Sequence, residues 1–129
     1  EWEYACRAGS ETTYSFGNDA SLQQSYAVFM AVQTETCGRK LPNGWGLFDM
    51  HGNVCEWCQD WRASYGSSKV VRDPIGPATG IFSRVLRGGS WGIGTGIALR
   101  SSYRFYDTPA RRGGNFGFRV VVEVGGVGP

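Results

Sequence analysis

The sequence predicts an α+β fold in which short strands and long irregular loops surround one core. Glycine and aromatic residues are both abundant, with 20 glycines and 14% aromatic residues among 129 positions. Glycine at about twice its usual share favours loops over a helical bundle, and the aromatic residues favour strands. A hydrophobic content of 41% over this length suffices for one domain with a real core. We therefore expect residues 1–129 to form a single domain.

The first part of the chain predicts one helix and little other regular structure. Residues 1–8 place apolar side chains early and an arginine late, and Gly9 supplies a stop signal. Residues 12–17 predict a short strand, and the polar residues 18–41 predict an irregular segment. Residues 41–53 contain Asn-Gly and several further glycines, so we expect turns there.

The second part of the chain predicts three strands. Residues 54–61 alternate well enough for a half-buried strand, and residues 82–86 are a second strand candidate. Residues 116–124 are β-branched and apolar, which makes them the third. Residues 62–80 are punctuated by proline and glycine and predict a loop.

Charge is distributed unevenly along the chain. The net charge of +2 is too small to indicate a nucleic-acid partner, and no apolar run is long enough to cross a bilayer. Residues 92–119 carry five arginines and one aspartate, a charge of +4, so the remainder sums to −2. That stretch also lacks a clear period of 2 or 3.6, and it predicts neither a long strand nor a long helix. We expect neither nucleic-acid binding nor membrane insertion.

The four cysteines allow two interpretations. Cys55 and Cys58 form a C-x-x-C motif with His51 four residues before it, a pattern found in metal and redox sites. A structural zinc site needs four ligands, and a redox dithiol normally precedes a helix in a βαβ unit. Neither context is recognisable, so we favour ordinary small buried thiols.

Five segments carry a resemblance to a known family. They occur in order over nearly the whole chain: residues 1–9, residues 42–54 with Glu56-Trp57, residues 73–77, residues 84–91, and residues 117–119 with Arg100, Arg104 and Pro109 before them. These motifs resemble the formylglycine-generating enzyme (sulfatase-modifying factor) family. The resemblance implies a variant of the C-type lectin-like fold, and it implies that the chain begins after the family's N-terminal strands.

The enzymatic activity of that family needs residues that this chain lacks. The family's oxidases use two cysteines after the Gly-Gly-Ser motif to bind copper, since soft sulfur ligands hold Cu(I). Here that segment offers Ile93, Gly96, Ile97 and Ala98, and residues 59–129 contain no cysteine. His51 is the single histidine, and Ser90 lacks a Gly-x-Ser-x-Gly context. We expect no catalytic residues and no enzymatic activity.

One metal site of the family carries over in part. Its calcium loop uses an Asx side chain, two backbone carbonyls and a glutamate, and the positions that match are Asp49, Gly52, Val54 and Glu56. Calcium prefers several oxygen ligands and accepts main-chain carbonyls. The alternative is that Asp49 caps the turn while Glu56 pairs with a core arginine. The resemblance leaves calcium as a possible cofactor and both interpretations open.

The segment after residue 87 also resembles the variable region of proteins that diversity-generating retroelements diversify. Such systems mutate adenines, and codons derived from AAC or AAT in this way never encode Lys, Glu, Gln, Met or Trp. Residues 92–119 contain none of these five types, whereas the other 101 positions contain nineteen. At that density about five would be expected. The alternative is a glycine-rich loop of biased composition.

The retroelement interpretation divides the segment into fixed and displayed residues. Tyrosine and phenylalanine offer large contact areas with few rotors, and glycine and asparagine adapt to a partner. The fixed residues are expected to be Trp91, Leu99, Arg100, Arg104, Pro109, Gly117, Phe118 and Arg119. The displayed, ligand-binding residues within 92–116 are expected to be Gly92, Ile93, Gly94, Gly96, Ile97, Tyr103, Phe105, Tyr106, Asp107, Arg112, Gly113, Gly114, Asn115 and Phe116.

Three functions follow from these observations. The preferred one is a monomeric, non-catalytic protein that binds a ligand, expected to be another protein, through a diversified surface. The second is an enzyme of the formylglycine-generating or sulfur-oxidising type with an atypical active site. The third is an interaction module fused to another domain.

Overall fold

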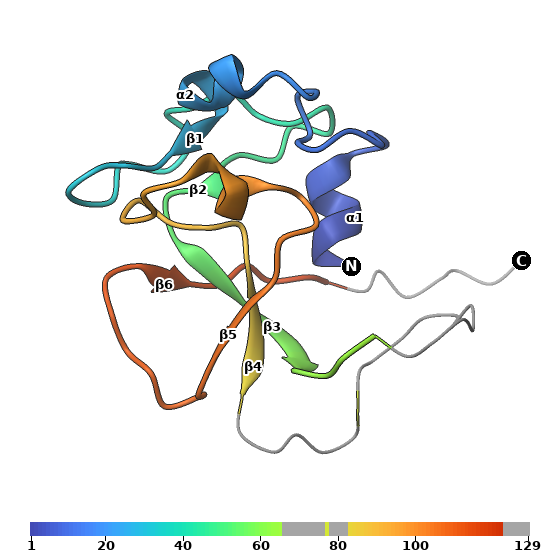
Figure 1. Ribbon diagram of the computed structural model, residues 1–129, viewed down its shortest axis with the longest axis vertical. Coiled ribbons are helices and arrows are strands. Elements are labelled where there is room, and N and C mark those ends of the chain that lie inside the picture. Colours follow the sequence, from blue (N-terminus) through green and yellow to red (C-terminus); the bar gives the residue numbers. More distant parts are fainter. Residues whose placement is uncertain (66–76, 78–82, 123–129) are drawn as a thin grey trace, which may run out of the picture.

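The computed structural model describes residues 1–65, 77 and 83–122 (Figure 1). The chain begins with helix α1, Trp2–Arg7, which agrees with the helix predicted for residues 1–8. It ends at Ala8, whose φ of 48° is left-handed, and Gly9 follows with a φ of 87°. The left-handed turn therefore starts one residue before the glycine that the sequence indicates.

Residues 12–41 hold more regular structure than predicted. The 3₁₀ helix η1, Ala20–Leu22, starts at Asp19, whose side chain accepts from the Ser21 amide, and leads into helix α2, Gln23–Tyr26. Strand β1, Ala27–Val28, follows and pairs in parallel with strand β2, His51–Gly52. The strand predicted over residues 12–17 is wrong, since only an isolated bridge joins Tyr14 to Gly17.

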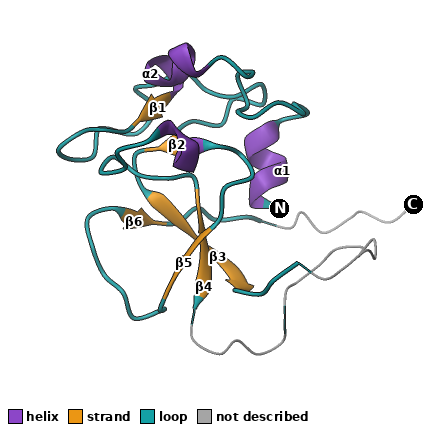
Figure 2. Cartoon of the chain, viewed as in Figure 1, coloured by secondary structure: helices purple, strands orange, loops and turns teal. Residues whose placement is uncertain are grey.

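A four-stranded sheet forms the second part of the fold. Its order is β5-β4-β3-β6, and β3, β4 and β5 overlap near the middle of the view in Figure 2. The bounds are Cys55–Trp61 for β3, Arg84–Arg87 for β4, Phe105–Asp107 for β5 and Phe116–Gly117 for β6. Strand β4 is antiparallel to β3 and β5, and β6 is parallel to β3. The strand predicted at 54–61 is confirmed, and the one at 82–86 is observed from Arg84 onward.

The strand predicted over residues 116–124 is wrong for most of its described length. Only Phe116 and Gly117 pair with a neighbour, and residues 118–122 form no strand. Phe118 and Val120 are 74% and 78% exposed. β-Branched residues favour strands because they pack against neighbours on a pleated face, and the described residues provide no such face here. Residues 123–124, and most of the loop predicted at 62–80, lie outside the described residues.

The core is small and is built largely from segments between the strands. Tyr14, Ala27, Phe29 and Leu99 form one buried cluster with Phe16 packed against it. Leu99 belongs to the 3₁₀ helix η2, Gly96–Leu99, so this cluster holds the middle of the long segment between β4 and β5. No helix in the described part of the chain has the length and hydropathy needed to cross a membrane.

Candidate functional site

The segment predicted to bind the ligand is anchored at its N-terminal side by two left-handed glycines. Gly88 and Gly89 have φ values of 87° and 76°. The Gly52 amide donates to the Gly88 carbonyl at 2.7 Å, and the Trp91 amide donates to the Asn53 carbonyl at 2.9 Å. These bonds tie the start of residues 92–116, here named the display segment, to the loop around β2.

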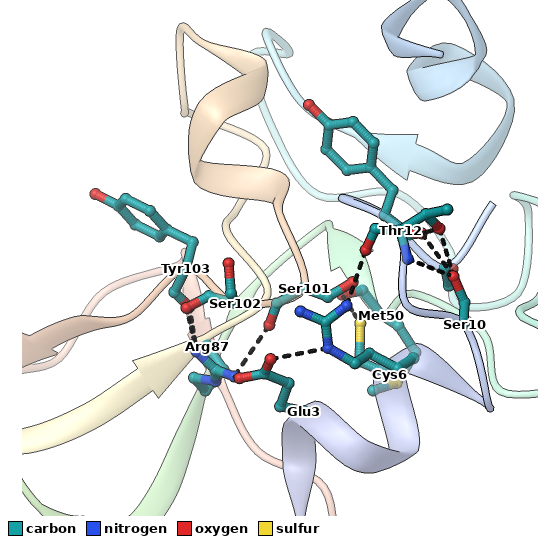
Figure 3. A network of polar contacts seen from close by, with 12 residues as sticks. Glu3, Cys6, Ser10, Thr12, Met50, Arg87, Ser101, Ser102 and Tyr103 are labelled. Carbon is teal, nitrogen blue, oxygen red and sulfur yellow. Dashed lines mark hydrogen bonds and ion pairs between the residues drawn. The ribbon is translucent and has the colours of Figure 1, made fainter. Parts of the chain in front are cut away.

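Arg87 holds the middle of the display segment (Figure 3). Its side chain is buried, and Nη1 donates to the carbonyls of Ser102 and Tyr103 at 3.0 and 2.6 Å. Nη2 donates to the Ser101 carbonyl at 3.0 Å and pairs with Glu3 of α1 at 2.5 Å. The guanidinium thus satisfies three loop carbonyls that no strand partner serves. Arg87 therefore braces the loop through these carbonyls and through the Glu3 carboxylate.

Solvent reaches all fourteen predicted ligand-binding residues. None of them is buried, whereas Leu99 and Ser101 in the same segment are 0% exposed. Ile97, Phe105 and Tyr106 are large apolar side chains with 58%, 44% and 43% of their surface exposed. Tyr103 is half-buried. The display segment therefore presents aromatic and aliphatic surface to solvent.

Six of the fourteen line one pocket of about 330 Å³. The strand register explains the convergence, because Phe105 lies opposite Leu86 and Phe116 lies opposite Cys55. Ile93 and Gly94 enter from the loop that precedes η2. The complete lining is Cys55, Leu86, Arg87, Gly89, Ser90, Ile93, Gly94, Thr95, Ala98, Tyr103, Phe105, Asn115 and Phe116.

The floor of this pocket consists of residues that the sequence analysis did not assign to the site. Leu86, Ser90 and Ala98 are buried and apolar or small. They come from β4, from the turn that follows it and from η2, so no local motif joins them. They could have been predicted only from the pairing of β4 with β5, and no sequence pattern indicates that pairing.

Tyr106, on the neighbouring position of β5, lies at a second hollow of about 290 Å³. The Arg62 guanidinium stacks on its ring at 3.7 Å, and Arg104 stacks on Tyr65 at 4.4 Å. Arg104 also donates to the Ala63 carbonyl. Tyr106 is therefore exposed on one face and held by a cation–π contact on the other.

Gly96 is the one predicted ligand-binding residue that faces the interior. A Cβ at this position would lie 2.6 Å from Cδ of the buried Gln23 and closer still to its amide atoms. The Gly96 carbonyl accepts from the Tyr14 hydroxyl at 3.3 Å and from Gln23 Nε2 at 3.4 Å. By contrast, a Cβ at Gly92, Gly94 or Gly114 would meet nothing within 4 Å. Gly96 thus contacts the scaffold through Gln23 while it stays partly accessible to solvent.

Glu56 of the predicted calcium loop pairs with an arginine, as the alternative to calcium binding expects. Its buried carboxylate forms a double contact with Arg119, both at 2.5 Å, and also accepts from Trp2 Nε1 at 2.5 Å. Asp49 has a φ of 58° and accepts from the Gly38 amide at 2.9 Å. Calcium would have to displace Arg119 from Glu56, so these residues do not fit the ion in this arrangement. Calcium at Asp49, Gly52, Val54 and Glu56 therefore rests on the family resemblance alone.

Three of the four cysteines show the features of structural thiols, whereas Cys37 is exposed. All four are free, and Cys6 and Cys55 are buried. Burial raises the pKa of Cys6 and of Cys58 to about 11, and it raises the pKa of Cys55 as well. Thiols in this state are protonated near neutral pH and are poor nucleophiles and poor metal ligands. Among the described residues no three His, Cys, Asp or Glu side chains gather as a metal site.

His51 is a buried scaffold residue held by hydrogen bonds on both ring nitrogens. Nε2 must accept, because the Ser15 amide donates to it at 3.2 Å. Nδ1 therefore carries the proton and donates to the Leu99 carbonyl at 2.7 Å. Desolvation by burial lowers the pKa of His51 below its ordinary value of 6.5, although the bond to Leu99 acts in the opposite direction.

The buried neutral histidine predicts a specific pH dependence of stability. The unfolded chain binds a proton near pH 6.5, and the folded chain binds it only at lower pH. The contribution of His51 is therefore fully present above pH 6.5 and is lost as the pH falls from there through the folded pKa. We expect the melting temperature to fall between pH 7.5 and 5.5, and the slope to decrease in His51→Gln. An equal slope in both proteins would contradict this assignment.

Comparison with known proteins identifies the family and relatives of known name. Residues 1–124 match the family described as the sulfatase-modifying factor enzyme 1-like domain, FGE-sulfatase. The chain is 39% identical to the serine/threonine-protein kinase pkn1 of Chlamydia pneumoniae over 96% of its length and 20% of the kinase. It is 36% identical to the formylglycine-generating enzyme of Streptomyces coelicolor over 92% of its length and 43% of the enzyme.

A solved structure resembles the fold closely. The Treponema denticola variable protein 1 superposes with a TM-score of 0.85 at 37% identity, over 92% of this chain and 43% of that one. The C-type lectin-like fold implied by the sequence motifs is thereby confirmed. The chain spans between a fifth and about two fifths of the length of these relatives.

Proposed function

We propose that the chain, which belongs to the sulfatase-modifying factor enzyme 1-like domain family, is a non-catalytic member that binds a protein ligand. The binding surface is the display segment, held on the lectin-like scaffold. One observation carries the proposal: the fourteen residues predicted to bind are all solvent-accessible, and six of them converge on one pocket. A variable protein with 37% identity and the same fold supports it.

We also propose that the display segment is diversified by a retroelement. The absence of Lys, Glu, Gln, Met and Trp from residues 92–119 fits adenine-directed mutation of asparagine codons. The bonds that hold the segment support this, because Arg87 acts on backbone carbonyls at residues 101–103. Backbone contacts do not depend on the side chains at the displayed positions. The scaffold can therefore keep one loop conformation while those side chains change.

The enzymatic alternative has less support from this chain. The segment that carries the family's copper-binding cysteines holds none, and no cysteine follows Cys58. His51 is buried with both nitrogens engaged, which leaves no free base there. The relative named as a formylglycine-generating enzyme supports the alternative.

Libraries at two sets of positions test the display function. Randomising Gly92, Ile97 and Arg112 should leave most members folded, because these side chains are exposed. Randomising Gly89, Leu99 and Ser101 should leave few folded, because these residues are buried. Protease resistance of the displayed proteins reports folding. Equal survival of the two libraries would contradict a scaffold that separates displayed from fixed positions.

Copper titration tests the enzymatic alternative separately. The purified protein should bind no stoichiometric Cu(I), because its described thiols are buried or isolated and no pair faces the pocket. Stoichiometric copper that is lost on mutating Cys55 would favour the enzyme. A family member known to bind Cu(I) provides the positive control for the titration.

A further inference from the structure

The pocket lined by the display segment contains no free charge. The Arg87 guanidinium is already engaged by three carbonyls and by Glu3. Burial raises the pKa of the Cys55 thiol, which keeps it neutral. A charged ligand group that entered would lose water and meet no counter-charge, which is costly. The occupant of the pocket is therefore uncharged.

The walls of the pocket are mostly carbon, and its volume can hold an apolar side chain. Leu86 and Ala98 form the floor, and Phe105, Phe116 and Ile93 form the sides. A volume of about 330 Å³ is at the small end of ligand sites in proteins. Ser90 is 2% exposed and is one of the few polar groups at the floor. Apolar anchors in such pockets commonly dominate protein–protein binding energy.

Two exposed arginines lie on the loop whose two ends line the pocket. Arg111 and Arg112 lie on the loop that joins Phe105 to Phe116, both of which line the pocket. Arg112 donates to the carbonyls of Pro109 and Arg111, and no ion pair is found for it within the described part of the chain. Arg111 has a distant partner in Asp107 at 3.9 Å and is 63% exposed. Guanidinium groups in this state can still take up carboxylates.

Exposed apolar side chains are also found outside the pocket lining. Phe105 lines the pocket, and Tyr106, the next residue of β5, and Ile97 of η2 are exposed although they do not line it. Exposed apolar surface of this kind next to a pocket is typical of protein interaction sites.

We propose that the pocket receives one uncharged apolar or aromatic side chain from a protein segment whose adjacent residues are aspartate or glutamate. The proposal rests on the ligand-binding function above and specifies its partner. The anchor side chain fills the cavity between Leu86 and Phe116. The flanking carboxylates pair with the arginines of the loop at residues 108–115.

Selection from a random peptide library displayed on phage tests the chemistry of the partner. The immobilised protein is the target, and a bare surface and an unrelated lectin-like domain are the counter-selections. Enriched peptides should combine one Phe, Tyr, Trp, Leu, Ile or Met with Asp or Glu within about three residues of it. A lysine- or arginine-rich consensus, a consensus without an apolar residue, or no enrichment would overturn the proposal.

Variants then locate the binding of an enriched peptide. Gly94 lines the pocket and has open space at its Cβ, so Gly94→Leu should fold and weaken binding at least tenfold. Gly44→Leu is the matched control, since Gly44 lies on a distant exposed loop where a Cβ makes only ordinary contacts. Arg112→Glu should weaken binding severalfold and reduce its dependence on salt. Arg39→Glu, an exposed arginine outside the display segment, should change neither.

The outcomes separate this proposal from the display function. If the peptide binds but Gly94→Leu and Gly44→Leu bind equally, the pocket is not the anchor site, and the display function is unaffected. If the library at Gly92, Ile97 and Arg112 yields no more folded members than the library at buried positions, the display function itself is contradicted. Melting curves of each variant distinguish loss of binding from loss of folding.

Discussion

Replacing Gly52 with alanine is expected to reduce the free energy of unfolding by about 3 kcal/mol or more. Gly52 has a φ of 93°, a region that residues with a side chain rarely adopt. A Cβ there would lie 2.9 Å from the backbone nitrogen and carbonyl carbon of Val28, and closer still to its carbonyl oxygen. The clash would separate β1 from β2 and disturb the bond from Gly52 to Gly88.

Urea denaturation of Gly52→Ala and Gly44→Ala measures this effect. Gly44 is exposed, and a Cβ there would lie 3.7 Å from the nearest atom, the Ala8 carbonyl oxygen, so its substitution should change stability by less than about 0.5 kcal/mol. Because domains are stable by only about 5–15 kcal/mol, Gly52→Ala should also shift the urea midpoint clearly. Equal midpoints for the two variants would show that the parallel pairing of β1 and β2 tolerates a side chain.

Removing the Glu56 carboxylate is the second change with a large expected effect. Glu56→Ala leaves the Arg119 guanidinium without its partner and Trp2 Nε1 without its acceptor. Breaking a buried pair from one side costs about 3–5 kcal/mol. Arg119 keeps 28% of its side chain exposed, so water screens part of the loss and about 3 kcal/mol is expected.

Glu35→Ala is the matched control, since Glu35 pairs with Arg39 only at 4.0 Å on the surface. It should cost less than about 1 kcal/mol in free energy of unfolding.

Thermal melts with and without a chelator test whether calcium binds, because an ion on Glu56 would make the stability of the wild-type protein depend on it. We expect no dependence, given that Arg119 occupies the carboxylate. A chelator-induced fall in the wild-type melting temperature that is absent in Glu56→Ala would instead establish the calcium site.

The elements that the sequence predicts are those with local patterns. Helix α1 has a polar start and a glycine stop, and β3 has a sequence typical of a half-buried strand, although its burial falls from Cys55 to Asp60 without alternating. Strands β1, β2 and β5 contain two or three residues each, too few for any period. They exist because of distant partners, such as His51 for Ala27. Residues 118–122 show the converse, since strong strand propensity produces no strand without a described partner.

The candidate site likewise has a part that the sequence indicates and a part that depends on contacts between distant residues. The resemblance to a variable region indicates positions of the display segment that solvent reaches, but it does not indicate that Gly96 packs against Gln23, which is 73 residues away in sequence. The pocket could not be predicted, because Cys55 meets Phe116 and Leu86 meets Phe105 only through the strand register. The uncharged interior likewise depends on Arg87 reaching Glu3 across 84 positions. Tertiary contacts therefore convert an exposed loop into a shaped surface.

Sequencing the DNA around the gene tests the central claim most directly. A diversified display segment requires a near-copy of the codons for residues 92–116 beside a reverse transcriptase gene. The two copies should differ only at adenines of the near-copy, and the codons of Leu99 and Ser101, which are buried, should be identical. A locus with no such repeat, or with differences spread equally over displayed and buried positions, would contradict the account.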